Sequence, residues 1–430
     1  MRPDYDVIIV GGRPAGSTLA ARLGRQGLRV LLLERAAFPS LPAVSCPLIN
    51  ASTLEMLDEI GADESAYAAG TPRIARMVQS LGAGVTIPFE LPEYAGRRYA
   101  YAVDRARFDA ALWDTATAMP TVDGRTGWSV TDVIVEDGRA YGVIATAPDR
   151  TTHRIIATLT IGADGRYSTV ARKMNAAERL RHDEHPTSIL YAYWRGTAPF
   201  DDGSAVAAAY GGEPGIGYLL MDSADGTCGV VVEGRSDIFE AQEDSGEALY
   251  LRFLKQQPDV WRRVQGAERV TSVRGIKRIG NLYRQAGGPG WALVGDALVQ
   301  QDPLDGQGIY NAVYTAKALS WAIRKWRDGE MDWVHALEWY DETVQIRTYS
   351  MYRQLLDRVQ ASLYTTIPQP MTDLMARWMG DDPILKQVMG RYITRQVPAE
   401  AVRLLTPGLM AAAVVRGAVR DGLRRLRGSA

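Results

Sequence analysis

A buried strand, a tight turn and a helix at the start of the chain constrain its fold more than any other segment. Residues 7–10 are Val-Ile-Ile-Val, an uninterrupted apolar run typical of strands that are covered on both faces. A glycine-containing turn follows at 11–16, then a helical apolar pattern that ends near Gly27, then a second apolar run at 30–33. The order strand, helix, strand predicts a β-α-β unit with parallel strands.

The turn has the composition of a phosphate-binding loop. A dinucleotide pyrophosphate binds to free backbone N–H groups at the positive end of a helix dipole, and side chains block its approach. Gly11 permits the tight turn and Gly16 permits close packing of the helix, while Gly12 and Ala15 belong to the same loop. The middle glycine of the pattern G-x-G-x-x-G is replaced by Arg13, whose guanidinium either reaches a phosphate or signals lost affinity.

The second apolar run ends in a carboxylate, Glu34, which is followed by Arg35. At this position of a dinucleotide-binding unit, a carboxylate accepts hydrogen bonds from an adenosine ribose. Glu34 therefore supports the nucleotide interpretation that Arg13 weakens.

Composition narrows the classes of function. The 49 basic and 50 acidic residues nearly cancel, to a formal net charge of -1, so no global field draws the protein to nucleic acid. Two cysteines are too few for a disulfide framework or a thiolate zinc site. No apolar run approaches the roughly 18 residues of a membrane span. We therefore expect a cytoplasmic protein with no metal site and no nucleic-acid partner.

Two later segments carry further glycine and aspartate motifs. Residues 161–168 are Ile-Gly-Ala-Asp-Gly-Arg-Tyr-Ser and follow an apolar strand, so that Asp164 and Gly165 lie at its end. Residues 294–297 are Val-Gly-Asp-Ala and are followed by Asp-Pro-Leu-Asp-Gly-Gln-Gly at 302–308, where a long helix to about Arg327 begins.

With all three segments in this order, residues 1–330 resemble the FAD-dependent oxidoreductases of the class A flavin monooxygenase type. These enzymes have the glutathione-reductase-type FAD fold, and their relatives include geranylgeranyl reductases and flavin-dependent halogenases. The resemblance implies an α/β protein in which a Rossmann-like FAD-binding domain carries an inserted β-rich substrate domain and a helical C-terminal region.

The resemblance also implies roles for individual residues. Gly11, Gly16 and Glu34 hold the ADP half of FAD, Arg105 contacts the cofactor, Asp164 supports the pyrophosphate region and Asp296 bonds the ribityl chain. The implied cofactor-binding set is Gly11, Gly12, Arg13, Ala15, Gly16, Glu34, Arg35, Arg105, Asp164, Gly165, Gly295, Asp296, Pro303, Gly306, Gln307, Gly308 and Ile309.

The loop at 302–308 has the properties that a flavin ring requires. Gly306 and Gly308 let backbone N–H groups approach the pyrimidine edge of the ring, and the following helix directs its positive end to the N1–C2=O region. Candidates beside the ring are Pro303, Cys46 and Tyr218, although Cys46 is better explained as a small buried residue.

Periodicity separates three regions, and the resemblance implies the role of each. Residues 1–180 and 280–330 form the FAD-binding domain, with helices at 50–60 and 105–118 and a hairpin turn at 137–138. Residues 181–279 form the β-rich substrate domain, with one helical stretch near 247–255, and residues 331–430 form the helical C-terminal region. His182 and His185 are expected in a solvated loop rather than in a metal site.

The chain departs from each group of relatives. Val299 stands where many monooxygenases have a histidine. The halogenase stretch Trp-x-Trp-x-Ile-Pro, which accompanies a catalytic lysine, is missing from the comparable residues 217–222. The aromatic and Phe-Pro motif of the geranylgeranyl reductases is also missing.

The leading hypothesis is a monooxygenase that hydroxylates or epoxidises a small hydrophobic, aromatic or polycyclic metabolite. In such enzymes reduced FAD and O2 form a flavin C4a-hydroperoxide. We expect NAD(P)H as a transient electron donor, or a separate flavin reductase. The alternatives are a reductase or dehydrogenase acting on a carbon–carbon bond, and a non-catalytic FAD-fold binding module.

The last helical segment carries an apolar stripe of Val415, Val419, Leu423 and Leu426, bordered by Arg416, Arg420, Arg424 and Arg427. A basic amphipathic pattern of this kind contacts a membrane or a carrier protein weakly. Docking of the stripe on the protein's own domain is the simpler interpretation.

Overall fold

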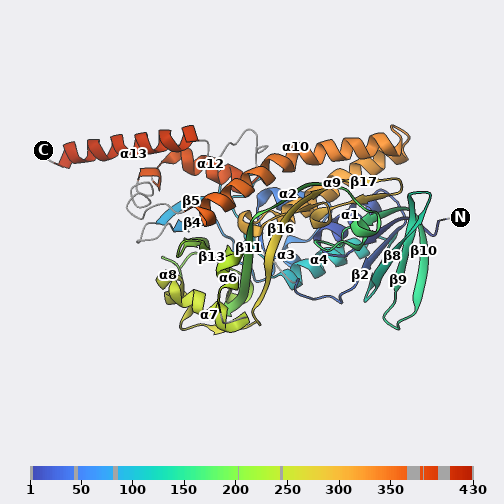
Figure 1. Cartoon of the computed structure of the whole chain (residues 1–430), viewed down its shortest axis with the longest axis horizontal. Helices are drawn as coiled ribbons and strands as arrows, with labels where there is room; N and C mark the ends of the chain where they lie inside the picture. The colour runs from blue at the N-terminus through green and yellow to red at the C-terminus, as the bar shows by residue number, and fades with distance from the viewer. Residues whose placement is uncertain are drawn as a thin grey trace.

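The computed structural model describes residues 3–42, 47–80, 86–201, 203–242, 246–365, 378–380, 382–395 and 407–428. Two large sheets form the body, and long helices run along one side of it (Figure 1). The architecture is the α/β fold that the sequence predicts, with a nucleotide-binding type of sheet, a second β-rich sheet and a helical C-terminal region.

The first sheet has eight strands, in the order β17-β18-β10-β1-β2-β7, and β8 and β9 extend it from β10. The pairs from β18 across β10, β1 and β2 to β7 are all parallel. α1 (Pro14–Arg25) connects β1 to β2, and α4 (Arg105–Thr117) leads into β7. The strands are β1 (Tyr5–Val10), β2 (Val30–Glu34), β7 (Val122–Thr126), β8 (Ser129–Glu136), β9 (Arg139–Thr146), β10 (Thr152–Gly162), β17 (Gly287–Gly288) and β18 (Trp291–Leu293).

The hairpin between β8 and β9 turns at Asp137 and Gly138, as predicted. Both residues have left-handed backbone conformations, with φ of 47° and 75°. Two positive φ angles in a two-residue loop match the right-handed twist of the flanking strands.

The second sheet has nine strands, in the order β19-β16-β11-β14-β13-β12-β4-β5, with β15 paired to β11. Its strands are β4 (Arg76–Ser80), β5 (Thr86–Glu90), β11 (Glu178–Arg195), β12 (Val206–Gly211), β13 (Ile216–Asp222), β14 (Thr227–Arg235), β15 (Glu268–Arg269), β16 (Arg274–Arg284) and β19 (Val299–Gln300). A short third sheet pairs β3 (Leu48–Ile49) with β6 (Tyr101–Ala102).

The second sheet recruits strands from outside 181–279. β4 pairs in parallel with β12, and β5 extends the sheet beyond β4. Neither strand was predicted. The parallel pairing that joins β4 to the second sheet is long-range and leaves no local signal in the sequence, and β5 follows it as the antiparallel neighbour of β4. The division at 181 and 279 stays a prediction, but the sheet itself is continuous across it.

Helices cover both sheets. They are α1 (Pro14–Arg25), α2 (Ala51–Asp58), α3 (Glu64–Tyr67), α4 (Arg105–Thr117), α5 (Thr169–Lys173), α6 (Ser236–Glu240), α7 (Gly246–Gln256), α8 (Pro258–Val264), α9 (Gly308–Arg327), α10 (Trp333–Val359), α12 (Pro383–Ile393) and α13 (Pro407–Gly428). Short helical turns occur at Ala224–Gly226, Gly295–Ala297 and Pro303–Asp305, and a π-helix at Gln360–Tyr364 continues α10.

The second sheet is accompanied by three helices, where the sequence predicted one. α7 matches the predicted stretch near 247–255, but α6 has only five residues and α8 only seven. Helices of this length complete too few turns to show an apolar period.

The largest apolar core lies between the first sheet and α1, α4, α9 and α10. A second core fills the space between the nine-stranded sheet and α7 and α8, and a third lies on the other face of that sheet. None of the described helices is both long enough and apolar enough to span a bilayer.

Candidate functional site

The glycine turn after β1 leaves no room for side chains. Gly11 has a φ of 104°, and a Cβ on it would lie 2.4 Å from the carbonyl oxygen of Ala163. A Cβ on Gly16 would lie 1.7 Å from the carbonyl oxygen of Gly11. The turn, the start of α1 and the end of β10 therefore meet backbone to backbone, and only glycine fits at these two positions.

Glu34 fixes the turn from the end of β2. Its buried carboxylate accepts hydrogen bonds from the backbone N–H of Gly12 at 2.8 Å and of Ala36 at 2.9 Å. Each carboxylate oxygen has a second acceptor position, which a ribose hydroxyl can use. The next residue, Arg35, has an exposed side chain.

Arg13 ties the turn to α4. Its Nη1 atom lies 2.5 Å from the carboxylate of Asp109 and donates to the carbonyl of Ser40 at 3.2 Å. Arg105 donates to the same fully buried carboxylate, from Nε at 3.0 Å. Arg13, which replaces the middle glycine, therefore has a structural role, because it and Arg105 share the carboxylate of Asp109 beside the turn.

The second segment joins the first at its backbone. A Cβ on Gly11 would lie 3.0 Å from the Cα of Asp164. The Asp164 carboxylate accepts from the hydroxyl of Ser168 and from the N–H of Thr169, both at 2.6 Å, and burial raises its pKa. These bonds hold the loop at 162–169, and Gly165 turns within it at a φ of 76°.

Arg166 connects the second segment to the third. It donates to the carbonyl of Gln301 at 2.5 Å, and its Nε lies 3.5 Å from the carboxylate of Asp296. Arg166 was not predicted as a site residue, because nothing in the spacing shows that the two loops meet.

Asp296 lies at the junction of all three segments. About a third of its side-chain surface (31%) is open, although it is surrounded by protein. Burial raises its pKa, and the charges of Arg166 and Arg105 act in the opposite direction. Beside it, a Cβ on Gly295 would lie 2.9 Å from the Cβ of Ala15, in the first turn of α1. The predicted convergence of the three segments is therefore present in the fold.

Several buried polar atoms around this junction have no hydrogen-bond partner in the described protein. They are Nη1 of Arg166, Oε1 of Gln301 and both amide atoms of Asn311, a residue in the first turns of α9. Unpaired buried donors and acceptors are costly, so their presence in one place indicates a polar ligand. A flavin dinucleotide, with its ribityl hydroxyls, phosphates and pyrimidine edge, supplies matching groups.

The loop that leads into α9 is clamped by the C-terminal helices. Asp305 is buried and ion-paired with Arg358 of α10, and it accepts from the hydroxyl of Tyr392 of α12 at 2.6 Å. Gln307 donates to Asp305 at 3.1 Å and to Tyr392 at 3.2 Å. Arg358 and Tyr392 were not predicted as site residues, because their distance along the chain from Asp305 leaves no readable pattern.

Gly306 lies in the loop that leads into α9, and Gly308 is the first residue of that helix. Gly306 is left-handed with a φ of 61°, and a Cβ on Gly308 would lie 4.0 Å from Oδ1 of Asp296. Ile309, in the first turn of α9, is buried in the largest apolar core. The N-terminus of α9 therefore points its free N–H groups to the space beside Asp296.

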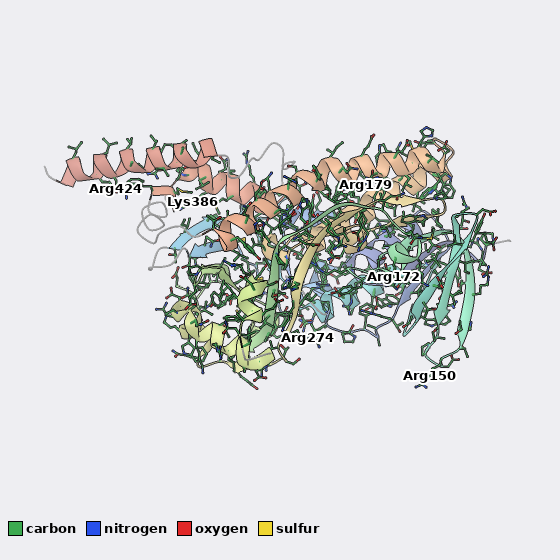
Figure 2. The ribbon with its side chains drawn as sticks, in the orientation of Figure 1. Arg150, Arg172, Arg179, Arg274, Lys386 and Arg424 are labelled. Atoms are coloured by element: carbon green, nitrogen blue, oxygen red, sulfur yellow. The ribbon has the colours of Figure 1, made fainter. Side chains whose placement is uncertain are left out.

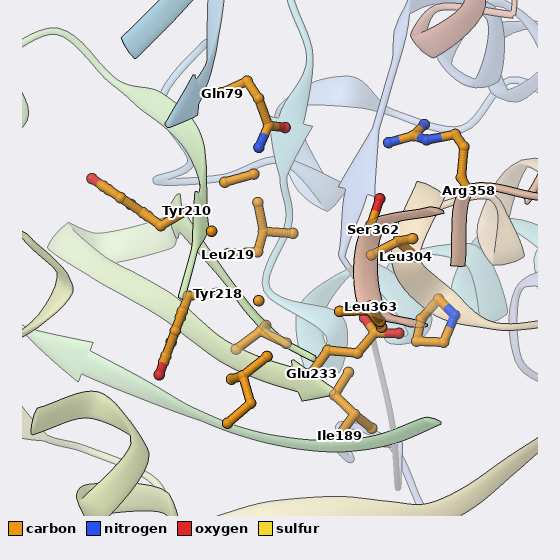
Figure 3. A pocket seen from close by; sticks show the side chains of 16 residues that line it. Gln79, Ile189, Tyr210, Tyr218, Leu219, Glu233, Leu304, Arg358, Ser362 and Leu363 are labelled. Carbon is orange, nitrogen blue, oxygen red and sulfur yellow. The ribbon is translucent and has the colours of Figure 1, made fainter. Parts of the chain in front are cut away.

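A cavity of about 160 Å³ lies between this loop and the nine-stranded sheet (Figure 3). Pro303 and Leu304 form one wall, and apolar side chains of the sheet, Leu219 among them, form the other. Polar side chains also line the cavity from different sides: Arg358 and Ser362 are neighbours in Figure 3, whereas Gln79 and Glu233 lie apart from them.

The three candidates for the ring face have different positions. Pro303 lines the cavity, and so does Tyr218, but the Tyr218 hydroxyl donates to the carbonyl of Phe253 at 2.8 Å and its ring extends toward α7. The Tyr218 hydroxyl is thus already used in packing. Cys46 lies outside the described residues.

His182 and His185 belong to strand β11, not to a loop as predicted. In the part of the chain that the structure describes, no three His, Cys, Asp or Glu side chains gather closely enough to hold a metal ion.

Comparison with known proteins agrees with this geometry. Residues 4–345 match the family model described as FAD binding domain. The chain is 26% identical over 333 residues to a 1H-pyrrole-2-carbonyl-[peptidyl-carrier protein] brominase of Pseudoalteromonas luteoviolacea, covering 76% of this chain and 79% of the relative. It is 29% identical over 325 residues to digeranylgeranylglycerophospholipid reductase 2 of Methanothermobacter thermautotrophicus, covering 73% and 76%.

A solved structure, a flavoprotein/dehydrogenase from Cytophaga hutchinsonii, superposes with a TM-score of 0.81 at 17% identity. The superposition covers 97% of this chain and 99% of that one. At this level of identity the likeness shows a shared fold, which here includes the C-terminal helices.

The substitution Gly16→Ala is expected to abolish FAD retention. The added methyl group meets the backbone of Gly11, and overpacking of this kind costs about 3 kcal/mol or more in the free energy of unfolding. Flavin content after desalting and urea-induced unfolding measure the two effects. The matched control is Gly266→Ala, since a Cβ there meets nothing within 4 Å. Full flavin content in the Gly16 variant would contradict the assignment of the turn.

The substitution Asp296→Asn is expected to stabilise the FAD-free protein at neutral pH. Because burial raises the pKa of Asp296, ionisation is less favourable in the folded chain than in the unfolded chain. The contribution of Asp296 to folding stability is fully present below the ordinary carboxyl pKa of 3.8, and it is lost as the pH rises through the raised pKa. The amide does not titrate, so the variant's advantage in unfolding free energy should grow with pH across this window. A constant difference between the two proteins would contradict the prediction.

Proposed function

Because the chain belongs to the FAD binding domain family, we propose that it is an FAD-dependent monooxygenase that acts on a small, mainly apolar metabolite. The observation that carries the proposal is the position of the cavity. Pro303 and Leu304, on the loop assigned to the flavin, form the wall opposite the nine-stranded sheet. A substrate in the cavity therefore lies against the loop that holds the ring.

The lining of the cavity indicates the class of substrate. Ile189, Leu219, Val231 and Leu363 provide an apolar body that suits an aromatic or polycyclic skeleton. Gln79, Glu233 and Arg358 offer polar contacts to the substituents of such a skeleton. The cavity therefore binds an apolar molecule and orients it through its polar groups.

Bound FAD would supply the redox chemistry, and the protein's part is binding, orientation and exclusion of water. Gly11, Gly16 and Glu34 are placed to hold the ADP half, and Asp296 to accept from the ribityl chain. The start of α9 offers backbone N–H groups that stabilise negative charge on a reduced ring. The π-helix at Gln360–Tyr364 covers the cavity through Ser362 and Leu363.

Halogenation fits the cavity less well. The relative from Pseudoalteromonas is named a brominase, and halogenases of this type are expected to use a lysine. Among the described residues that line the cavity, the charged side chains are Glu233 and Arg358, and none is a lysine. This composition supports oxygen transfer by the flavin over transfer through a lysine.

The second candidate is a flavin-dependent reductase acting on a carbon–carbon double bond. It is favoured by the 29% identity to a digeranylgeranylglycerophospholipid reductase and by the apolar body of the cavity. In either case we propose NAD(P)H, docked transiently or acting through a separate reductase, as the source of electrons.

Oxygen consumption distinguishes the two candidates. Purified protein with bound FAD is expected to oxidise NAD(P)H and consume O2 when an apolar aromatic substrate is added, with one oxygen atom entering the product. Labelled O2 and mass spectrometry of the product measure this incorporation. Turnover that continues without O2 and saturates a double bond would establish the reductase instead. A folded protein that takes up no added FAD would exclude both.

The substitution Leu219→Trp is expected to raise the apparent KM by about tenfold or more, because an indole fills part of the cavity. FAD content should stay unchanged, since Leu219 lies on the sheet side. The control is Lys277→Trp on β16, where the side chain is exposed. Equal KM values for the two variants would place substrate binding elsewhere.

A further inference from the structure

Helix α13 packs on its own domain through a small and charged side. Ala413 is fully buried, and a Cβ on Gly417 would lie 2.4 Å from the Cβ of Trp378. Arg416 binds the buried carboxylate of Asp382 at 2.7 Å, and Arg420 donates to the carbonyl of Trp378 at 2.9 Å. These contacts fix which side of the helix faces the protein.

The opposite side carries the apolar stripe, and it is exposed. The exposed fractions are 61% for Val415, 56% for Val419, 52% for Leu423 and 70% for Leu426. Spacings of four, four and three residues place these side chains on one face. A helix of a soluble domain normally buries its aliphatic face, so an exposed aliphatic stripe of this kind marks a contact surface. Docking on the protein's own domain, the simpler expectation from the sequence, is therefore wrong for the stripe.

The charge of the helix indicates the kind of partner. Residues 407–428 contain five arginines, at 416, 420, 424, 425 and 427, and one acidic residue, Asp421. A helix with arginines as its cations and one continuous aliphatic face matches an anionic lipid surface, where the aliphatic side chains enter the acyl boundary. A second copy of the helix is disfavoured, because two helices of the same strong positive charge repel each other.

The position of the helix permits this contact. α13 lies at one end of the long axis, extended away from both sheets (Figure 1). Arg424, labelled in Figure 2, lies toward its outer end, well removed from the two sheets. The stripe from Val415 to Leu426 spans about 16 Å along the helix axis. A helix in this place can lie flat on a planar surface.

We propose that α13 is a membrane-surface helix, which attaches the protein to an anionic lipid bilayer through Val415, Val419, Leu423 and Leu426. The helix lies in the interface and does not cross the bilayer. The stripe is exposed in the absence of lipid, because Arg416 binds Asp382 and Arg420 binds Trp378 on the opposite side of the helix.

Vesicle co-sedimentation tests this attachment without reference to activity. The full protein is mixed with vesicles of phosphatidylcholine alone, or of phosphatidylcholine and phosphatidylglycerol in equal parts. We expect at least about tenfold stronger partition onto the anionic vesicles, weakened by added salt. The double variant Val419→Glu, Leu423→Glu should lose this binding.

The matched control is the double variant Val334→Glu, Ile346→Glu in α10, whose side chains are 62% and 64% exposed. It introduces the same charges at equally open positions and should bind as the wild type does. Circular dichroism confirms that both variants are folded.

Four outcomes would overturn the proposal. The wild type stays in solution with anionic vesicles, or the α13 variant sediments as the control does. Alternatively, analytical ultracentrifugation shows a stripe-dependent dimer, or a purified acidic carrier protein binds the stripe, with no vesicle binding in either case.

Discussion

The close backbone contact between Gly11 and Gly16 is the constraint on which the rest of the structure depends. Since a Cβ on Gly16 would lie 1.7 Å from the carbonyl oxygen of Gly11, the turn closes only with glycine at that position. The closed turn brings the end of β10 against Gly11, and Gly295 against the first turn of α1. Three segments far apart in the sequence therefore share one small volume, and Asp296 faces it.

The C-terminal helices contribute to the site as well as to the fold. Asp305 links the loop before α9 to α10 through Arg358 and to α12 through Tyr392. Arg358 also lines the cavity beside the loop. The same guanidinium therefore stabilises the loop assigned to the flavin and lines the cavity, which couples the position of that loop to what occupies the cavity.

The sequence predicted the parts of the fold that depend on local pattern. The first β-α-β unit, the hairpin at Asp137 and Gly138 and the limits of α9 follow from apolar periodicity and glycine positions, and the structure confirms them. The pairing of β4 with β12 and the ion pair of Asp305 with Arg358 join distant residues, so neither was predicted. The role of Arg13 was not predicted either, because it depends on a contact with Asp109, which lies outside the motif of the turn.

The buried carboxylate of Asp382 has a consequence for the whole C-terminal arm. It caps α12 by accepting from the N–H of Leu385, and the hydrogen bond from Arg416 holds its pKa below the ordinary value. Loss of α13 would leave the Asp382 carboxylate without its cationic partners and would loosen the first turn of α12. Since Tyr392 of α12 donates to Asp305 in the loop beside the cavity, proteolytic removal of the tail would act about one helix length away, on the loop that precedes α9.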